Sequence, residues 1–517
     1  MSACQGSQGP GTPTTTPPTS LPTSGPTTGG TSGSGTTGGV PLPGGGSPLG
    51  AHWDPSRQQL FDPYLETLRG SSTYYEVVWC DVEPTPGQRR WGPVDRISAA
   101  AQQHGITLLL KIRVGVCGAT GGSAQHVRGS AGKTESAMPK DMNAYSDFVR
   151  DLVSRYSANG VHEYAVENEV NSPSYWSASV QDYIALATRA AATIRATSRQ
   201  AEVVDAGMSS TSYGYGIANR LLGSGQATQA VAAYGTYFQR RIGTRGEQIP
   251  TVTTVDQLRA VLASAQGQRN LEFLKAARTL AESHVVDVRQ VHFYEPWNAL
   301  PDLLAYLHEE TPTSTPIEAW EVGSFWQSPT ATATQRADDM TRSLALLLAG
   351  GVRRVLWLPL ASNESNRHGE EVRFGLLDPD GTVRAAGVTM RAMVQATQGA
   401  TISPVRTGRL EGAAFRRSGQ TTLVVWATGG QVQLDVGTGA HTAQVGAGFA
   451  PAAITLVRIG AAPVLVHATR LADDRLLSGC CPRPPRPAGR VGALGPAPVF
   501  GPSAPRRAST HAAPRSS

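Results

Sequence analysis

The first 50 residues of this 517-residue chain contain no aspartate, glutamate, lysine, arginine or histidine. They are mostly threonine, glycine, proline and serine, a composition with too little apolar surface to offset the entropy lost on folding. Residues 476–517 lack aspartate, glutamate and lysine but carry six arginines, which equal the whole formal charge of +6. We therefore expect disordered segments at 1–47 and 469–517, with the folded region between them.

Residues 51–475 are formally neutral, because the six arginines after them account for the whole net charge. No basic face on a folded element is visible, so nucleic acid is not expected as a partner. No apolar run is long enough to span a membrane, and the printed residues include no signal-peptide core. Cys4, after Ser2-Ala3 and before the linker, nevertheless resembles the lipid-anchor residue of a bacterial lipoprotein, although a chance cysteine is the alternative. We expect an extracellular or cell-envelope protein, tethered to a membrane if Cys4 is lipidated.

Only five cysteines are present, and no spacing among them is that of a zinc site. Cys80 and Cys117 follow consecutive predicted strands, where they could form a bridge or remain two half-buried thiols. No glycine-rich phosphate loop follows an early strand. We predict neither a metal site nor a cofactor.

The middle of the chain alternates short apolar strands with amphipathic helices, eight times in about 350 residues. Such alternation predicts a parallel sheet, and eight units favour a closed (β/α)8 barrel over 48–399. The rival, an open doubly wound sheet, would normally carry the missing phosphate loop. Residues 210–270 show no clear pattern and are expected to wall a cleft. The predicted strands are 49–53, 73–80, 106–112, 161–168, 202–206, 286–293, 316–322 and 354–360. The predicted helices are 57–69, 93–104, 141–156, 179–197, 271–283, 300–309, 335–349 and 383–397.

The character of the sequence changes near residue 400. Short β-rich runs at 421–426, 431–436, 442–445 and 453–459 are separated by glycines. We predict a small β-sandwich domain at 400–468.

Two predicted barrel strands end in glutamate. The apolar run Tyr164–Val166 leads to Asn168-Glu169, and the run from Ile317 leads to Glu321. In a (β/α)8 barrel the functional site lies where strands end, so the two carboxylates would face one pocket. Two such carboxylates are the minimum requirement for cleaving a glycosidic bond.

Tryptophans gather at the same predicted rim. Aromatic residues are only 6% of the chain, yet eight of the nine tryptophans fall between Trp53 and Trp357. Flat aromatic faces suit the apolar faces of sugar rings, although packing under a loop is the better interpretation of any one of them. The candidates for contact with a sugar are Trp79, Trp176, Trp297, Trp326 and Trp357, together with His52 at the end of the first strand.

Several motifs together resemble the clan A glycoside hydrolases, most closely the family 39 type. The resemblance covers about residues 48–465 and rests on the order and spacing of the motifs. They are Asn168-Glu169, His292-Phe293-Tyr294, Glu321-Val322-Gly323, the segment Trp79–Gly87 with Trp91, and Phe374–Asp378 with Asp380-Gly381.

The resemblance implies a role for each matching residue. Glu169 would be the general acid/base and Glu321 the nucleophile. Asn168 would hold the sugar 2-hydroxyl, and Tyr294 would orient the nucleophile with His292 nearby. Trp357 would form the floor of the subsite where the bond breaks.

The sequence departs from the family pattern at two points. Val170 stands where a proline often follows the Asn-Glu pair, and the second strand has no arginine to steady the nucleophile. We expect Arg113 on the third strand to substitute. Glu167 and Glu318 are rivals for the two catalytic roles, and we interpret both as paired structural carboxylates.

The sequence therefore predicts a retaining glycoside hydrolase that acts on a polysaccharide or oligosaccharide, as a monomer. The alternative is a catalytically silent carbohydrate-binding envelope protein. A lyase or aldolase would need a metal cluster or a Schiff-base lysine, and only Lys111 among the few lysines lies on a predicted strand.

Overall fold

The computed structural model describes residues 46–121, 123–128, 133–242, 249–324, 331–361, 375–451 and 453–469. Cys4, Trp326, Phe374 and nearly all of both predicted tails lie outside these residues. None of the helices in the described ranges has the length and apolar character needed to cross a membrane.

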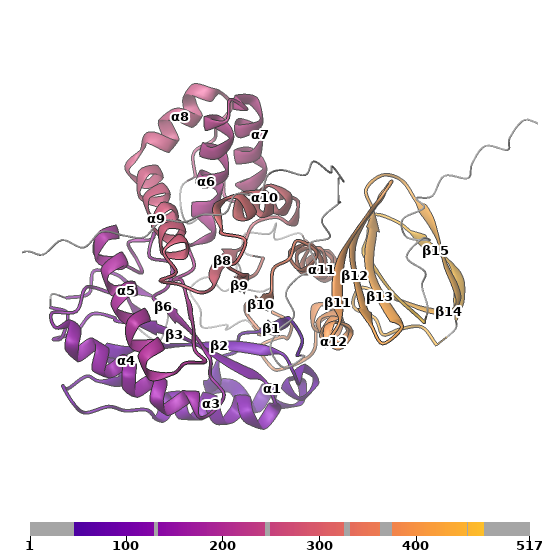
Figure 1. The fold of residues 1–517 in the computed structure, drawn as a ribbon. Helices are drawn as coiled ribbons and strands as arrows, with labels where there is room; N and C mark the ends of the chain where they lie inside the picture. The colour runs from indigo at the N-terminus through magenta and orange to yellow at the C-terminus, as the bar shows by residue number, and fades with distance from the viewer. Residues whose placement is uncertain are drawn as a thin grey trace, which may run out of the picture.

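Within the described residues, eight parallel strands form one sheet that closes into a barrel (Figure 1). The strand order is β7-β6-β3-β2-β1-β10-β9-β8, and isolated parallel bridges from Val204 to Val288 and from Met208 to Val291 join the two outer strands. The predicted (β/α)8 barrel is therefore confirmed. Its strands are β1 (Leu49–Ala51), β2 (Ser72–Val78), β3 (Thr107–Arg113), β6 (Glu163–Val166), β7 (Glu202–Val204), β8 (Arg289–Phe293), β9 (Ile317–Val322) and β10 (Arg354–Trp357).

Amphipathic helices cover the outside of the barrel and begin where capping residues stand. Ser179 and Asp182 form a reciprocal capping box at the start of α5, and α3 ends at Gly105, whose left-handed φ of 62° suits glycine. The predicted helix at 57–69 is α1 flanked by two short 3-10 turns, η1 (Pro55–Arg57) and η2 (Glu66–Leu68). The covering helices are α1 (Gln58–Leu65), α3 (Gly92–His104), α4 (Met142–Ser157), α5 (Val180–Thr197), α9 (Ala265–Glu282), α10 (Leu300–Glu310), α11 (Ala333–Ala349) and α12 (Ala385–Thr397).

The segment without a sequence pattern, 210–270, folds into helices that stand above the barrel with the first part of α9 (Figure 1). Its four tyrosines are buried. Tyr215, Tyr234 and Tyr237 pack edge-on around Phe238, and Tyr213 packs edge-on against Tyr306. They therefore belong to the same hydrophobic core as the barrel. The helices are α6 (Ser210–Gly223), α7 (Ala227–Tyr237) and α8 (Val255–Ala263).

The barrel interior has three chemically different layers. At the amino-terminal ends of the strands, Glu163 and Glu318 pair with Arg354. An apolar layer above them includes Leu109 and Trp320. Polar side chains fill the carboxyl ends of the strands, as expected for the functional face of such a barrel.

The C-terminal unit is an antiparallel sheet of six strands in the order β11-β12-β13-β16-β14-β15. Two runs that we predicted as separate strands, 431–436 and 442–445, form one strand, β14. Its first part pairs with β15 and its last part with β16. The strands are β11 (Thr401–Thr407), β12 (Leu410–Arg417), β13 (Gln420–Ala427), β14 (Val432–Gln444), β15 (Ile454–Ile459) and β16 (Val464–Thr469).

This sheet packs against α11 and α12 of the barrel (Figure 1). Trp426 of β13 meets Trp297, which lies in η3 (Trp297–Ala299), with ring centroids 6.1 Å apart. The Arg342 guanidinium of α11 lies over both rings, at 5.0 and 5.8 Å from their centroids. The two units therefore share one continuous hydrophobic core.

Candidate active site

The site is built on an unusual turn that follows β6. Glu167 and Glu169 both have positive φ, 70° and 45°. Residues other than glycine seldom adopt this conformation, which costs free energy and persists where surrounding contacts enforce it. The backbone N–H of Glu169 donates to the carbonyl oxygen of Gly207 at 2.9 Å, and that of Glu167 donates to Ile112 at 2.8 Å. The turn directs the Glu169 side chain over the barrel mouth.

Position 207, in the loop after β7, needs a glycine because a side chain approaches its backbone closely. Its φ is +60°, and a Cβ placed there would lie 2.5 Å from Nε2 of His292. Only glycine lets the chain pass beside this ring without displacing it. The position of the His292 imidazole is thus fixed by the neighbouring backbone.

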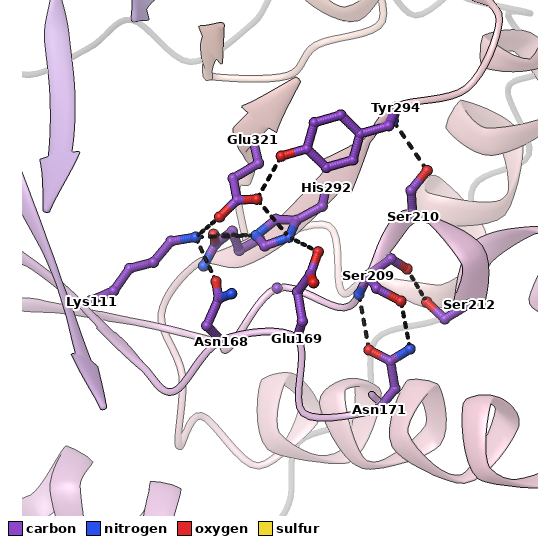
Figure 2. A network of polar contacts seen from close by, with 12 residues as sticks. Lys111, Asn168, Glu169, Asn171, Ser209, Ser210, Ser212, His292, Tyr294 and Glu321 are labelled. Atoms are coloured by element: carbon purple, nitrogen blue, oxygen red, sulfur yellow. Dashed lines mark hydrogen bonds and ion pairs between the residues drawn. The ribbon is translucent and has the colours of Figure 1, made fainter. Parts of the chain in front are cut away.

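Glu321, near the end of β9, receives three hydrogen bonds. Figure 2 shows those from Lys111 and Tyr294. Lys111 Nζ and Tyr74 Oη donate to Oε1 at 2.5 and 3.1 Å, and Tyr294 Oη donates to Oε2 at 2.6 Å. Burial alone would raise the pKa of this carboxyl. The charges of His292 and Lys111 and the hydrogen bonds from Lys111 and Tyr294 outweigh burial and lower the pKa to about 2. Glu321 is therefore an anion at neutral pH.

Glu169 and Glu321 both lie at Nδ1 of the His292 imidazole. Oε1 of Glu169 lies 2.8 Å from His292 Nδ1, while Oε2 of Glu321 lies 3.5 Å from that nitrogen. On the far edge of the ring, Nε2 is 3.0 Å from Oε1 of Gln290, whose amide nitrogen donates to the carbonyl oxygen of Asp205 at 2.7 Å. A buried chain of polar groups thus holds the His292 ring with its Nδ1 beside both glutamates (Figure 2).

The two carboxylates are close enough to act on one atom. One oxygen of Glu169, one of Glu321 and a ring nitrogen of His292 all lie within 4.8 Å of one another. Among the described residues, this trio is also the one group that could coordinate a cation. However, Lys111 already brings a positive charge to Glu321.

Two asparagines of the Glu169 turn have different functions in the structure. Asn168 Oδ1 accepts a hydrogen bond from Lys111 Nζ at 2.7 Å, which places its side chain inside the site. Asn171 bonds to Ser209 through both ends of its amide and to Asn270 of α9. It therefore ties the turn to the loop after β7 and to the helices above.

His52 lies at the end of β1, half-buried at the edge of the site. Its ring stacks on Tyr74 with centroids 4.3 Å apart, and Nδ1 donates to the Tyr74 carbonyl oxygen at 3.0 Å. Burial and the nearby charge of Lys133 lower the pKa of His52 to about 4. The ring is therefore neutral at pH 7 and supports the tyrosine that contacts Glu321.

Arg113 does not occupy the place that we expected for it. Its guanidinium lies 3.6 Å from Glu76 and 3.8 Å from Glu167, and it donates to the carbonyl oxygen of Thr134 at 2.8 Å. Arg113 is the last residue of β3, two positions after Lys111 and therefore nearer the carboxyl end of the strand. The cation beside Glu321 is Lys111, to which the sequence analysis gave no role at the nucleophile.

The two rival glutamates have structural partners. Glu167 Oε1 accepts a hydrogen bond from the Val114 N–H at 2.7 Å, and burial raises its pKa to about 7. Glu318 lies at the opposite end of the barrel from the site and accepts from Arg353 at 2.6 Å and Trp320 at 2.7 Å.

The tryptophans are less concentrated at the site than the sequence suggested. Trp79 opens the short helix α2 (Trp79–Val82) and packs on Tyr145 and Phe148 of α4. Trp176 is buried against Tyr183 of α5, and Trp297 contacts the C-terminal sheet. Trp357 alone of the described candidates ends a barrel strand, paired in register with Val322 beside Glu321.

Cys80 and Cys117 form a disulfide that links the segments after β2 and β3. The sequence left open whether these cysteines form a bridge or remain free thiols, and the structure contains the bridge.

Sequence reasoning missed three side chains of the site, Lys111, Tyr74 and Gln290. Each stands inside a run that we interpreted as a strand. Lys111 is a single charge within the apolar run 106–112, and Gln290 is a lone amide within 286–293. A polar side chain in a strand covered on both faces was the available signal, because such a group is buried only with partners.

Taken together, the fold and the site define a (β/α)8 barrel with two buried carboxylates at the carboxyl ends of its strands. No protein-family model matches this chain, and no curated protein sequence matches it. Comparison with solved structures does give matches.

The matching structures include several family 39 glycoside hydrolases. One from the gut symbiont Bacteroides cellulosilyticus WH2 is 13% identical with a TM-score of 0.55, covering 83% of this chain and 82% of that one. A GH39 β-xylosidase from Caulobacter crescentus is 12% identical with a TM-score of 0.53, covering 84% and 98%. A GH39 enzyme from Xanthomonas axonopodis pv. citri is 13% identical with a TM-score of 0.51, covering 84% and 96%. At this identity the likeness concerns the fold, and it confirms the resemblance to clan A glycoside hydrolases.

Proposed function

We propose that this protein is a retaining glycoside hydrolase, with Glu321 as nucleophile and Glu169 as general acid/base. One observation carries the proposal. Two carboxylates from different strands lie with oxygens within 4.8 Å, and one of them is held as an anion by three donors. A retaining mechanism needs carboxyl groups about 5–5.5 Å apart, whereas an inverting one needs about 6.5–9.5 Å to admit a water.

In the first step, a carboxylate oxygen of Glu321 attacks the anomeric carbon as the bond from that carbon to the leaving oxygen breaks. Glu169 gives its proton to the leaving oxygen, so the leaving group departs as a neutral alcohol. Because Tyr74, Lys111 and Tyr294 hold both oxygens of Glu321, little reorganisation is needed as its charge is transferred to the new bond.

In the second step, the Glu169 carboxylate removes a proton from a water molecule. The water oxygen bonds to the anomeric carbon while the bond to Glu321 breaks, which restores the Glu321 anion and the protonated Glu169. His292, with Nδ1 at 2.8 Å from Glu169, is placed to stabilise both protonation states of that residue in turn.

The remaining candidates fit the handling of a sugar at this position. Asn168 presents its amide next to Glu321 and is available to a hydroxyl of the bound ring. Trp357, at the end of β10, would form the floor of the subsite; its position at a strand end beside β1 supports this role. We expect a polysaccharide or oligosaccharide substrate, a monomeric enzyme, and an extracellular or cell-envelope location with Cys4 as a lipid attachment point.

The proposal is tested by reducing-end release from a panel of bacterial and plant polysaccharides and aryl glycosides. Wild type is compared with Glu321→Gln, Glu169→Gln and, as a matched control, Glu167→Gln two positions along the same turn. Loss of hydrolysis in the first two variants alone supports the assignment. Activity that survives in both means that other carboxylates act. Sugar binding without hydrolysis in wild type favours the alternative, a carbohydrate-binding envelope protein.

A further inference from the structure

Lys111 is the least expected residue of the site, and we propose that it is a positioning residue for the reaction. Its ammonium would hold the Glu321 carboxylate ionised and fix it relative to Asn168. This inference rests on the proposed function, because it assigns Lys111 to the same reaction.

The contacts of Lys111 join the two halves of the site (Figure 2). Nζ donates to Glu321 Oε1 at 2.5 Å and to Asn168 Oδ1 at 2.7 Å, and it lies 3.3 Å from His292 Nε2. Glu321 comes from β9, whereas Asn168 follows β6. One ammonium therefore sets the distance between the side chain that attacks the sugar and a side chain next to the general acid.

The surroundings leave this ammonium little freedom. The Lys111 side chain is fully buried, and Nζ lies 4.3 Å from the centre of the Tyr74 ring, within the range of a cation–π contact. An ammonium has three N–H donors, and two of them are used at short distance. A buried cation is tolerated only when it is paired, and the Glu321 carboxylate is its anionic partner.

The consequence for Glu321 follows from charge. An opposite charge within about 4–6 Å lowers the pKa of a carboxyl by about 1–3 units. Burial opposes the ionisation of Glu321. Without Lys111, only the charge of His292 and the hydrogen bonds from Tyr74 and Tyr294 would favour the ionised form. A fraction of the enzyme would then carry a protonated, inactive nucleophile at mildly acidic pH.

A merely structural role would give Lys111 a different signature. If the side chain only filled space, its loss would destabilise the fold by the same amount whether or not Glu321 carried a charge. If it pairs with Glu321, the cost depends on that charge, since an unpaired buried carboxylate is left behind.

A thermal double-mutant cycle separates these cases without requiring any substrate. The variants are Lys111→Met, Glu321→Gln and the double variant, with Lys275→Met, an exposed lysine on α9, as control. We expect Lys111→Met to lower the Tm by several degrees in wild type and by much less in the Glu321→Gln background. An equal loss in both backgrounds, or failure of both Lys111→Met proteins to fold, overturns the proposal.

The pH profile of kcat/KM then tests the effect on the reaction, with a substrate from the hydrolysis panel. In Lys111→Met the acid limb should move to higher pH by about 1–3 units, and the plateau should fall about 10²-fold because Glu321 and Asn168 are no longer held together. An unmoved acid limb overturns the proposal. If the thermal cycle shows coupling but wild type hydrolyses nothing, the pairing of Lys111 with Glu321 stands, and the role of Lys111 in the reaction is overturned together with the proposed function.

Discussion

Replacing Glu163 with glutamine should stabilise the protein at alkaline pH, although it removes a buried ion-pair partner. Glu163 begins β6, at the amino-terminal ends of the barrel strands. Its carboxyl group contacts Arg354, which also pairs with Glu318, and the charge of Glu318 acts on it. Burial and the negative charge of Glu318 raise its pKa from 4.5 to about 8, more than Arg354 lowers it. Near neutral pH Glu163 is therefore a neutral acid, which glutamine resembles in shape and charge.

The magnitude follows from proton linkage. The pKa of Glu163 is higher in the folded state than in the unfolded chain, so the folded state binds more protons between pH 4.5 and about 8. The free energy of unfolding therefore falls as pH rises through this window, by up to about 1.4 kcal/mol per pH unit. Glutamine does not ionise in this range, so Glu163→Gln removes this dependence of the free energy of unfolding on pH.

Urea unfolding at several pH values between about 5 and 9 measures the effect as the free energy of unfolding. The variant should match wild type near pH 5 and exceed it by several kcal/mol near pH 9. The control is Glu318→Gln, which weakens the pairing of Arg353 and Arg354 and should cost about 3–5 kcal/mol. If Glu163→Gln destabilises at pH 9 as much as the control does, the assignment of the proton to Glu163 is refuted.

Three further predictions concern single contacts. Tyr294→Phe removes a 2.6 Å hydrogen bond to the Glu321 anion. Because a bond to a charged group contributes about 1.5–3 kcal/mol, the acid limb of the kcat/KM profile should move to higher pH by about 1–2 units. An unchanged acid limb would show that the hydroxyl does not act on Glu321. The Cys80–Cys117 bridge closes a loop over a separation of 37 residues. Replacing both cysteines with serine should therefore lower the free energy of unfolding by about 4 kcal/mol. Equal stability of the oxidised and reduced wild-type protein would contradict this prediction. Burial raises the pKa of Glu167 to about 7, so Glu167→Gln should keep near wild-type kcat at pH 6, and a loss of more than about 100-fold would make this residue a catalytic candidate.

Much of the barrel could be predicted because its signals are local. The eight strands are apolar runs and the helices are amphipathic, and caps such as Ser179 and Gly105 stand where the helices begin and end. The C-terminal strands β11, β12 and β16 were not predicted. β11 and β12 form a hairpin in which charged side chains such as Arg406 and Arg416 interrupt the apolar run that would mark a strand.

The site was predicted in part. Glu169 and Glu321 could be found because strand ends converge in a barrel, a rule that needs only the order of elements. Lys111 could not be paired with Glu321 from sequence, since the contact spans 210 positions and depends on how residues on β3 and β9 face each other across the interior. The tryptophans misled for the opposite reason. Trp79 directly follows β2 but packs on α4, and Trp176, in the loop between β6 and α5, packs on α5. The sequence pattern does not distinguish such helix packing from a position facing the site.

The most direct test of the proposed double displacement is identification of the residue that carries the sugar. A 2-deoxy-2-fluoro glycosyl fluoride of the sugar released in the panel slows the second step, so that the glycosyl-enzyme accumulates. Peptide mass spectrometry then locates the added mass. We predict one glycosyl unit on the peptide containing Glu321, and none in Glu321→Gln. A sugar attached to another carboxylate, or turnover with inversion of the anomeric centre and no adduct, would contradict the account.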